Sequence, residues 1–430
     1  MGKYNKAFIL VALVMFPALL FAQFNNNTTS PYSRYGIGEL HPYSFGRSTA
    51  MGGASIASRN NEQINLGNPA SYDAIDSLGF MFEFAVNAKS VQFVDNIGKT
   101  VANDINFQYF AMNFQVNNRI GTSLGLVPFS DVGYNVTVDQ DIENTGAVRT
   151  TYYGTGTVSN VFLGAALQPF KFLSVGANLN YYFGMLNRNA EIVFSGAADF
   201  YNMQQYKSLR VSDFSIDYGL QATIPLKNKN KLVVGVVFEN NPKYNAFFSD
   251  ITKKNLVSGS GSNAVVDQDT LFFIEETKGA IEFPVTYGIG ISYKKENKFE
   301  INADYYHQAW SEAKFLGTKS NFLTDLNKFA IGAEWIPDKF SIKSYTNRIA
   351  YRAGLRYEQT YLIFNNRQIN DFGITFGVGL PVYRSKSTIN VAAEIGKKGT
   401  KQENLLQENY FRLNLMVNLY DLWFIKRRFD

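Results

Sequence analysis

Residues 173–185, LSVGANLNYYFGM, alternate between apolar and polar side chains almost residue by residue. One face of an extended strand would carry Leu173, Val175, Ala177, Leu179, Tyr181, Phe183 and Met185, and the other Ser174, Gly176, Asn178 and Asn180. Strands of soluble proteins usually span ~5–6 residues, whereas a strand that crosses a bilayer needs ~9–11. The length of this alternation therefore predicts a membrane-spanning strand with one side toward lipid.

The same pattern recurs later in the chain, in residues 283–293, 299–305, 349–357, 372–380 and 411–419. Counting comparable segments from residue 78 onward gives about fourteen strands, and bacterial single-chain barrels have even numbers. Short polar turns alternate with longer links, and the longest link, 240–280, is expected to extend strands or cover the mouth. Because an open sheet edge cannot face lipid, the sheet must close. The sequence predicts an all-β fold, a transmembrane antiparallel β-barrel formed by residues 78–430.

Composition agrees with a lipid-facing sheet and excludes several other classes. Aromatic residues make up 15% of the 430 residues and charged residues 18%, against ~25% charged in a typical soluble protein. The mean hydropathy of −0.15 is too polar for a helical membrane protein. The absence of cysteine excludes disulfides and thiolate chemistry. A net charge of +5, spread along the chain, does not indicate a nucleic-acid partner.

Residues 1–22 have the pattern of a cleaved signal peptide. Lys3 and Lys6 precede an apolar run over 7–21, and Ala22 offers a small residue for cleavage before Gln23. An uncleaved membrane anchor is the alternative, but no cluster of charges follows the run. We expect export to the outer membrane of a Gram-negative bacterium, with outer-membrane lipid around the barrel.

Residues 23–77 do not alternate and are rich in Asn, Ser, Gly and Tyr. A long segment without strands before the first strand of a barrel is expected to fold inward as a plug, called the hatch below. A disordered tail is the alternative, although the recurring Tyr, Ile and Leu make the segment more apolar than most such tails.

Two motifs in this segment carry a family resemblance. Ala50-Met51-Gly52-Gly53-Ala54, followed by Asn68-Pro69-Ala70, resembles the hatch signature of the FadL/OmpP1 family of outer-membrane transporters for long-chain fatty acids and hydrocarbons. Residues 309–311, 331–335 and 351–357 are similar to later segments of that family, and 421–430 resembles the ends of its Bacteroidetes members. The resemblance implies fourteen strands with the hatch in the lumen.

The motif residues have two interpretations. Pro69 fixes its own φ and pushes Asn68 out of the helical region, while Gly52 and Gly53 permit close approach or unusual backbone angles. The bend either gates a hydrophobic path or belongs to a fixed plug. Pro284, expected within a wall strand, removes one ladder hydrogen bond and is a candidate wall defect.

Charged residues on the lumen parity include Glu334, Arg352, Arg356 and Glu394. Arg352 and Arg356 are the candidate contacts for an anionic ligand, because a guanidinium can bind a carboxylate through two hydrogen bonds. The alternative is a lattice of ion pairs that stiffens the lumen.

The sequence offers no catalytic constellation. Its two histidines, His41 and His307, have no visible nucleophile beside them, and no phosphate-binding loop follows Gly53. We expect no enzyme, no metal site and no cofactor.

Two functions follow from the resemblance. The first is passive uptake of fatty acids or other hydrophobic small molecules. The second is a non-transporting accessory barrel in a larger outer-membrane complex for protein secretion or barrel assembly, with other outer-membrane or periplasmic proteins as partners. A continuous apolar cavity reaching a gap in the wall would favour uptake, and a packed polar lumen would favour the accessory barrel.

Overall fold

The computed structural model describes residues 27–41, 45–96, 98–143, 145–195, 201–240, 242–258 and 265–423. The predicted signal peptide, residues 1–22, lies outside the described residues, as does 424–430.

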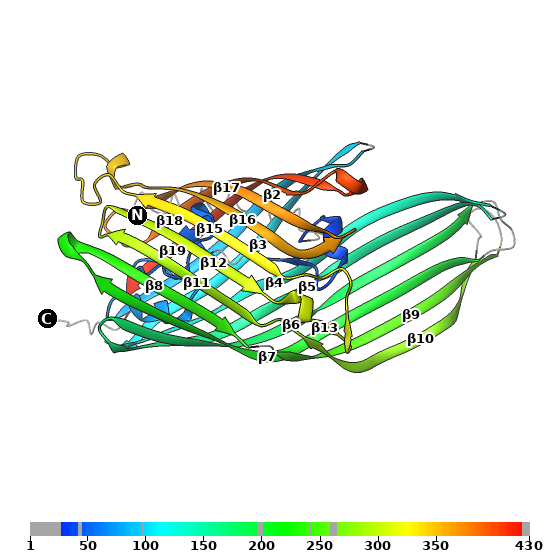
Figure 1. The fold of residues 1–430 in the computed structure, drawn as a ribbon, viewed down its shortest axis with the longest axis horizontal. Helices are drawn as coiled ribbons and strands as arrows, with labels where there is room; N and C mark the ends of the chain where they lie inside the picture. Colours follow the sequence, from blue (N-terminus) through cyan, green and yellow to red (C-terminus); the bar gives the residue numbers. More distant parts are fainter. Residues whose placement is uncertain are drawn as a thin grey trace, which may run out of the picture.

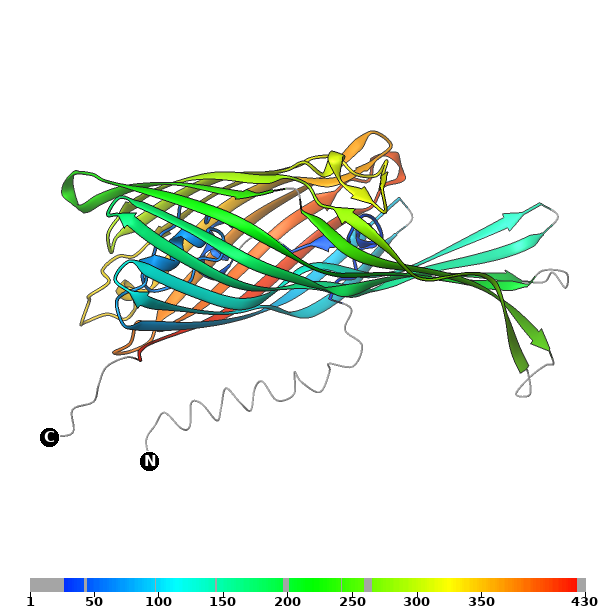
Figure 2. The same cartoon turned by 90° about the horizontal axis from the view of Figure 1, so that it is seen from below.

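The described chain forms a closed antiparallel barrel of 14 strands, which confirms the predicted fold class (Figures 1 and 2). Two of the wall strands are interrupted, so that each consists of two consecutive elements. The wall strands are β2 (Gly79–Val94), β3 (Lys99–Asn117), β4 (Ile120–Ile142), β5 (Gly146–Phe170), β6 (Leu173–Ser195), β7 (Asn202–Pro225), β8 (Asn230–Glu239) continued by β9 (Lys243–Ser258), β10 (Val265–Glu282) continued by β11 (Thr286–Lys295), β12 (Phe299–Gln308), β15 (Leu326–Trp335), β16 (Ala350–Phe364), β17 (Arg367–Pro381), β18 (Thr388–Gly399) and β19 (Gln407–Leu422).

The last strand closes the ring on the first. β19 pairs with β2 from Gln407 opposite Val94 to Leu422 opposite Gly79. The predicted alternation holds along the wall: Ile289 is 52% exposed on the outside, whereas Asn302 is fully buried on the inside. Outward apolar and inward polar side chains are what a lipid-facing barrel requires.

Several strands are much longer than a bilayer needs. β4 to β7 each have 23 to 25 residues, against the ~9–11 that cross a membrane. With β9 and β10 they extend beyond the ring as a sheet, called the fin below (Figure 2). The link 240–280, expected to extend strands or cover the mouth, is mostly strand, as β9 and β10. Leu271 to Ile274 are all apolar and Glu275 and Glu276 follow them, so the sequence of β10 does not alternate and no period-two pattern marked it as a strand.

Most connections at the opposite end, called the turn end, are tight, as in residues 171–172 and 296–298. One is long: residues 336–349 join β15 to β16 and include the single turn η7 (Thr346–Arg348). We call residues 336–349 the lip loop. It stands out at the left end in Figure 1.

Residues 27–41 and 45–77 lie inside the ring (Figures 1 and 2, dark blue). They form three single-turn helices and one short strand: η1 (Pro31–Arg34), β1 (Glu39–Leu40), η2 (Gly46–Met51) and η3 (Pro69–Ala74). β1 pairs with β4 near the fin, and the segment leads into β2 at the turn end.

The remaining elements are short: η4 (Lys227–Lys229), η6 (Trp310–Glu312), β13 (Lys314–Phe315), β14 (Thr318–Lys319) and η8 (Gln402–Asn404). None of the helices in the described ranges has the length and apolar character needed to cross a membrane.

Candidate functional site

The first hatch motif ends η2 against the wall. Met51 is fully buried, and Gly52 adopts a left-handed conformation with φ of 66° that terminates the turn. The Gly52 amide donates to Thr375 Oγ1 on β17 at 2.8 Å, and the Gly53 amide donates back to the Ser48 carbonyl at 2.8 Å. These residues therefore fix one side of the hatch to the wall.

The second motif caps η3 on another side of the lumen. The Asn68 side chain accepts from the Ala70 amide at 3.0 Å and donates to the Ile56 carbonyl at 2.9 Å. Asn68 and Ala70 are fully buried, and Pro69 occupies the first position of η3. The structure thus places the two motifs on different wall sectors, η2 against β15–β18 and η3 against β3–β7.

Wall glycines make room for the hatch backbone. A Cβ on Gly354 would lie 2.2 Å from the Gly52 nitrogen, and one on Gly176 would lie 2.5 Å from the Pro69 carbonyl carbon. A Cβ on Gly235 would lie 2.3 Å from the Ile56 carbonyl oxygen. The strand parity predicted Gly176 and Gly354 to face inward, but not that main chain packs on them.

Arg47 of η2 is the centre of a buried ion-pair cluster at the hatch–wall contact. Its guanidinium donates to Glu334 Oε1 at 2.9 Å and to Ser58 Oγ at 2.9 Å, and it also pairs with Glu300. Arg352 binds the other oxygen of Glu334 at 2.7 Å. Sequence reasoning missed Arg47, because the hatch has no periodicity that would assign it a direction.

Arg356 belongs to a second ion-pair layer. It binds Glu394 at 2.7 Å and Asp371 at 2.8 Å, and Glu394 also pairs with Arg412 at 2.9 Å. Arg352 and Arg356 are thus each bonded to carboxylates, and they do not line the same cavity. The arrangement corresponds to the ion-pair lattice that was the alternative to ligand contact.

Glu39 of β1 was also missed. It accepts from Lys89 on β2 and from Lys398 on β18, each at 3.2 Å. Burial alone would raise the pKa of the Glu39 carboxyl, but Lys398 and Lys89 hold this pKa well below its usual range. The hatch therefore carries a charged carboxylate between two wall lysines. His41, close by, contacts Asp131 of β4.

Pro284 lies between β10 and β11, not within a strand, so the predicted strand through residues 283–285 is interrupted. The neighbouring wall strand is interrupted at the same level, between β8 and β9, where Pro242 stands. The Phe283 amide donates to the Pro242 carbonyl at 3.0 Å across the two breaks. Proline supplies no amide hydrogen for the ladder, which explains why pairing stops at both places.

A cavity of about 110 Å³ adjoins these breaks. Apolar hatch and wall residues such as Phe45, Leu66 and Phe162 line it, together with the carboxylates of Asp217 and Glu239. Its lining also includes Tyr218 and Phe238, whose side chains are exposed on the outside of the barrel.

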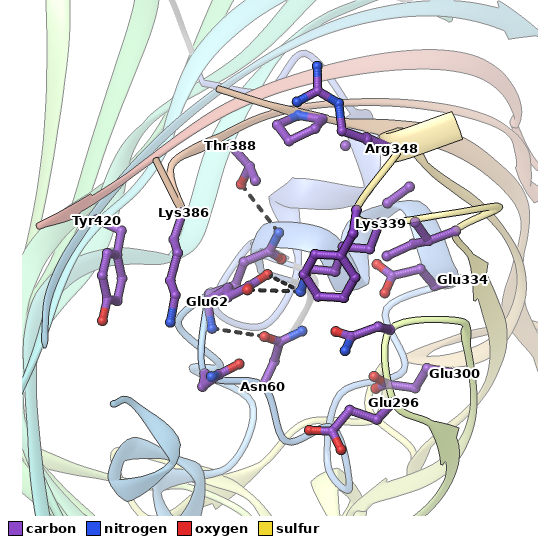
Figure 3. Close-up of a pocket in the computed structure, with 18 of the residues that line it drawn as sticks. Asn60, Glu62, Glu296, Glu300, Glu334, Lys339, Arg348, Lys386, Thr388 and Tyr420 are labelled. Atoms are coloured by element: carbon purple, nitrogen blue, oxygen red, sulfur yellow. Dashed lines mark hydrogen bonds and ion pairs between the residues drawn. The ribbon is translucent and has the colours of Figure 1, made fainter. Parts of the chain in front are cut away.

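A larger cavity of about 640 Å³, which we call the vestibule, opens at the turn end (Figure 3). Hatch residues Asn60 to Gln63 line it on one side, and the lip loop and the turns of β11–β12 and β17–β18 line it on the others. Lys339 of the lip loop binds both carboxylate oxygens of Glu62 at 2.8 Å. No residue lines both the vestibule and the 110 Å³ cavity.

Within the described part of the chain, no group of three His, Asp or Glu side chains is placed to hold a metal ion.

Comparison with known proteins identifies the family and the fold. A family model described as BamG matches residues 4–430. No curated protein matches the sequence.

Among solved structures, the Pseudomonas putida toluene transporter TodX is 16% identical, with a TM-score of 0.56 over 90% of this chain and 100% of TodX. A Pseudomonas aeruginosa FadL homologue is 10% identical, with a TM-score of 0.57 over 90% of this chain and 99% of its own. The CymD monoaromatic hydrocarbon channel is 15% identical, with a TM-score of 0.52 over 89% and 99%. The predicted resemblance is confirmed for the fold.

Proposed function

Since this chain belongs to the BamG family, we propose that it is a non-transporting accessory barrel of a larger outer-membrane complex, one that serves protein secretion or barrel assembly. In this proposal residues 1–22 are the signal peptide, 23–77 the hatch and 78–430 the barrel of a Bacteroidetes-type member. The turn end faces the periplasm, and the fin faces outward. The chain is not an enzyme and needs no cofactor.

The packing of the hatch is the observation that carries this proposal. Main chain contacts wall glycines at Met51–Gly52, Ile56 and Pro69, with no side chain between them that could swing aside. Removing one partner of a buried ion pair costs about 3–5 kcal/mol, and moving the hatch would separate Arg47 from both Glu300 and Glu334. A plug held in this way suits a barrel that works through its surfaces.

Passive uptake of hydrophobic compounds is the second candidate, and the 110 Å³ cavity favours it. The cavity reaches Tyr218 and Phe238 on the outer face beside the paired strand breaks, so a small apolar molecule could leave sideways into the bilayer. Against it, pockets that enclose drug-sized ligands have about 300–1,000 Å³. The solved structures of the same fold include a toluene transporter and a monoaromatic hydrocarbon channel.

One pair of measurements on a deletion strain separates the two candidates. The strain is complemented with affinity-tagged wild type or with Val237→Trp, which fills the 110 Å³ cavity that Val237 lines. Uptake of radiolabelled oleate and toluene is measured beside native-gel isolation of the tagged protein from the outer membrane.

The accessory role predicts a stoichiometric complex and unchanged uptake in all strains. Loss of uptake in both the deletion and the Val237→Trp strain, with a tagged barrel that migrates alone, would replace the accessory role with transport.

A further inference from the structure

The vestibule carries an excess of positive charge. Eight basic and five acidic side chains line it, a net charge of +3. The basic residues are Lys294, Lys295, Lys298, Lys339, Arg348, Arg352, Arg384 and Lys386, and the acidic ones are Glu62, Glu296, Glu300, Glu334 and Asp421.

Internal ion pairs use only part of this charge. Glu62 binds Lys339, and Glu334 binds Arg352 and Arg47. Among the described residues, no carboxylate lies within ion-pair distance of Lys295, Arg348 or Arg384. Arg348 Nε is also buried without a hydrogen-bond partner among them. Arg348 lies over the ring of Tyr345 and Arg384 over the ring of Tyr383, so each guanidinium has an aromatic neighbour but no anion. Guanidinium groups without an anion on the lining of one cavity favour a ligand that brings carboxylates or phosphates, because a guanidinium binds either through paired hydrogen bonds.

The lip loop adds an apolar edge to this basic cavity. Phe340 lines the vestibule and is 73% exposed, and Ile342 nearby is fully exposed. Exposed apolar side chains beside unpaired cations are suited to a ligand with both acidic and apolar groups. A volume of about 640 Å³ admits a few residues of an extended chain and no folded domain.

Two other occupants fit less well. The residues that follow Leu422 in the sequence include Lys426, Arg427 and Arg428, which would add to the positive charge. Lipid headgroups lie outside the ring, whereas the vestibule is lined by the hatch, the inner ends of strands and the lip loop (Figure 3).

We propose that the vestibule, with Arg348, Arg384 and Phe340, binds an acidic, partly apolar peptide segment of a periplasmic partner protein. This inference rests on the proposed accessory function and gives it a docking point. Because Lys339 of the lip loop holds Glu62 of the hatch, the docked segment lies directly on the hatch. The hatch then forms the floor of the docking site.

The test uses the full-length barrel in a neutral detergent and a fluorescein-labelled peptide of alternating Glu and Leu. Anisotropy titrations compare wild type with the double variant Arg348→Glu/Arg384→Glu. The matched control is Lys227→Glu/Lys229→Glu, which makes the same charge change on an exposed turn outside the vestibule. A milder pair, Arg348→Gln/Arg384→Gln, replaces the double variant if heat-modifiable gel mobility shows that it does not fold.

We expect the wild type and the control to bind alike, and the vestibule variant to lose about tenfold or more in affinity. Added salt should weaken wild-type binding, because dissolved ions screen the attraction between the peptide carboxylates and the basic lining. Equal binding by the vestibule variant, no binding by wild type, or preference for a Lys/Leu peptide would overturn the inference. Displacement of the peptide by phosphatidylglycerol micelles, but not by phosphatidylcholine micelles, would do so as well and assign the site to lipid.

Native-gel isolation separates this inference from the proposed function. A wild-type barrel found in no complex would refute the accessory role. A complex that forms equally well with the vestibule variant would leave that role standing and refute the docking point.

Discussion

Glu300→Gln is expected to release the hatch from the wall. Glu300 is 1% exposed and accepts hydrogen bonds from Ser58 at 2.9 Å and Asn302 at 3.1 Å, besides its ion pair with Arg47. Lys294 lies 3.7 Å from its second oxygen. The substitution preserves the shape of the side chain, removes its charge and replaces one acceptor oxygen with an NH2 donor.

The magnitude follows from the charges that remain. Arg47, Lys294 and Arg352 share Glu300 and Glu334, and without Glu300 three cations share one carboxylate. Breaking a buried pair by removing one partner costs about 3–5 kcal/mol. A change of about 1.4 kcal/mol in free energy changes an equilibrium constant tenfold. The population of the open state of the hatch should therefore rise about a hundredfold to a few thousandfold.

Trypsin reports this population, because Arg47 and Arg59 are cleavage sites within the hatch and both are shielded when it is docked. Cleavage of a transiently opened segment follows the population of its open form when closing is fast. Mass spectrometry of the digested barrel should show faster cleavage after both arginines in Glu300→Gln.

The matched control is Glu296→Gln, four residues earlier. Glu296 is 48% exposed and lies 3.7 Å from Lys231, and such surface pairs contribute about 0–1 kcal/mol. Its cleavage rate should equal that of wild type. If Glu300→Gln were cut no faster than Glu296→Gln, the buried cluster would not be what holds the hatch.

Three further outcomes are expected. Gly354→Ala places a Cβ 2.2 Å from the Gly52 nitrogen, so it should lower the free energy of unfolding by about 1–3 kcal/mol. Gel-shift assays should show this as a lower unfolding temperature. Asn68→Ala removes the cap of η3 and the hydrogen bond to the Ile56 carbonyl, and it should lower the free energy of unfolding by about 1–2 kcal/mol. The same gel-shift assay measures the effect. Burial raises the pKa of Asp76, but Lys386 and Asn61 lower it further, so that it lies below 3.8. A carboxyl whose pKa is lower in the folded than in the unfolded state stabilises the fold at pH values above its unfolded pKa of about 3.9. The stability advantage of wild type over Asp76→Asn should therefore disappear as the pH falls below about 4. An unchanged difference at pH 3 would contradict this.

The wall was predictable because its chemistry repeats. Alternation assigns Asn302 and Arg352 inward and Ile289 outward, and the structure agrees. The alternation is lost in β9 and β10 of the fin, where residues 271–274 are a continuous apolar run, so a period-two pattern could not mark them as strands. The break at Pro284 was expected as a lost hydrogen bond within a strand. The adjacent break at Pro242 turns it into a gap in pairing across two strands, which no single segment of sequence reveals.

The lumen was less predictable, for a physical reason. Hatch contacts are made by turns and main chain, so the partners of Arg47 and Glu39 depend on tertiary structure. The lip loop also escaped prediction, since long connections were expected only at the other end. The motif residues Gly52 and Asn68 were recognisable by resemblance, and their backbone roles by the properties of glycine and asparagine.

The position of Glu39 has a consequence for how the molecule is assembled. The ring has one seam where the chain itself provides no link, between its first wall strand and its last, and Glu39 binds Lys89 and Lys398 on the two strands that flank β19. Ser30 contacts Glu408 on β19 itself. The hatch, which precedes every wall strand in the described chain, therefore binds all three strands at the seam, β18, β19 and β2, and ties the two ends of the ring together.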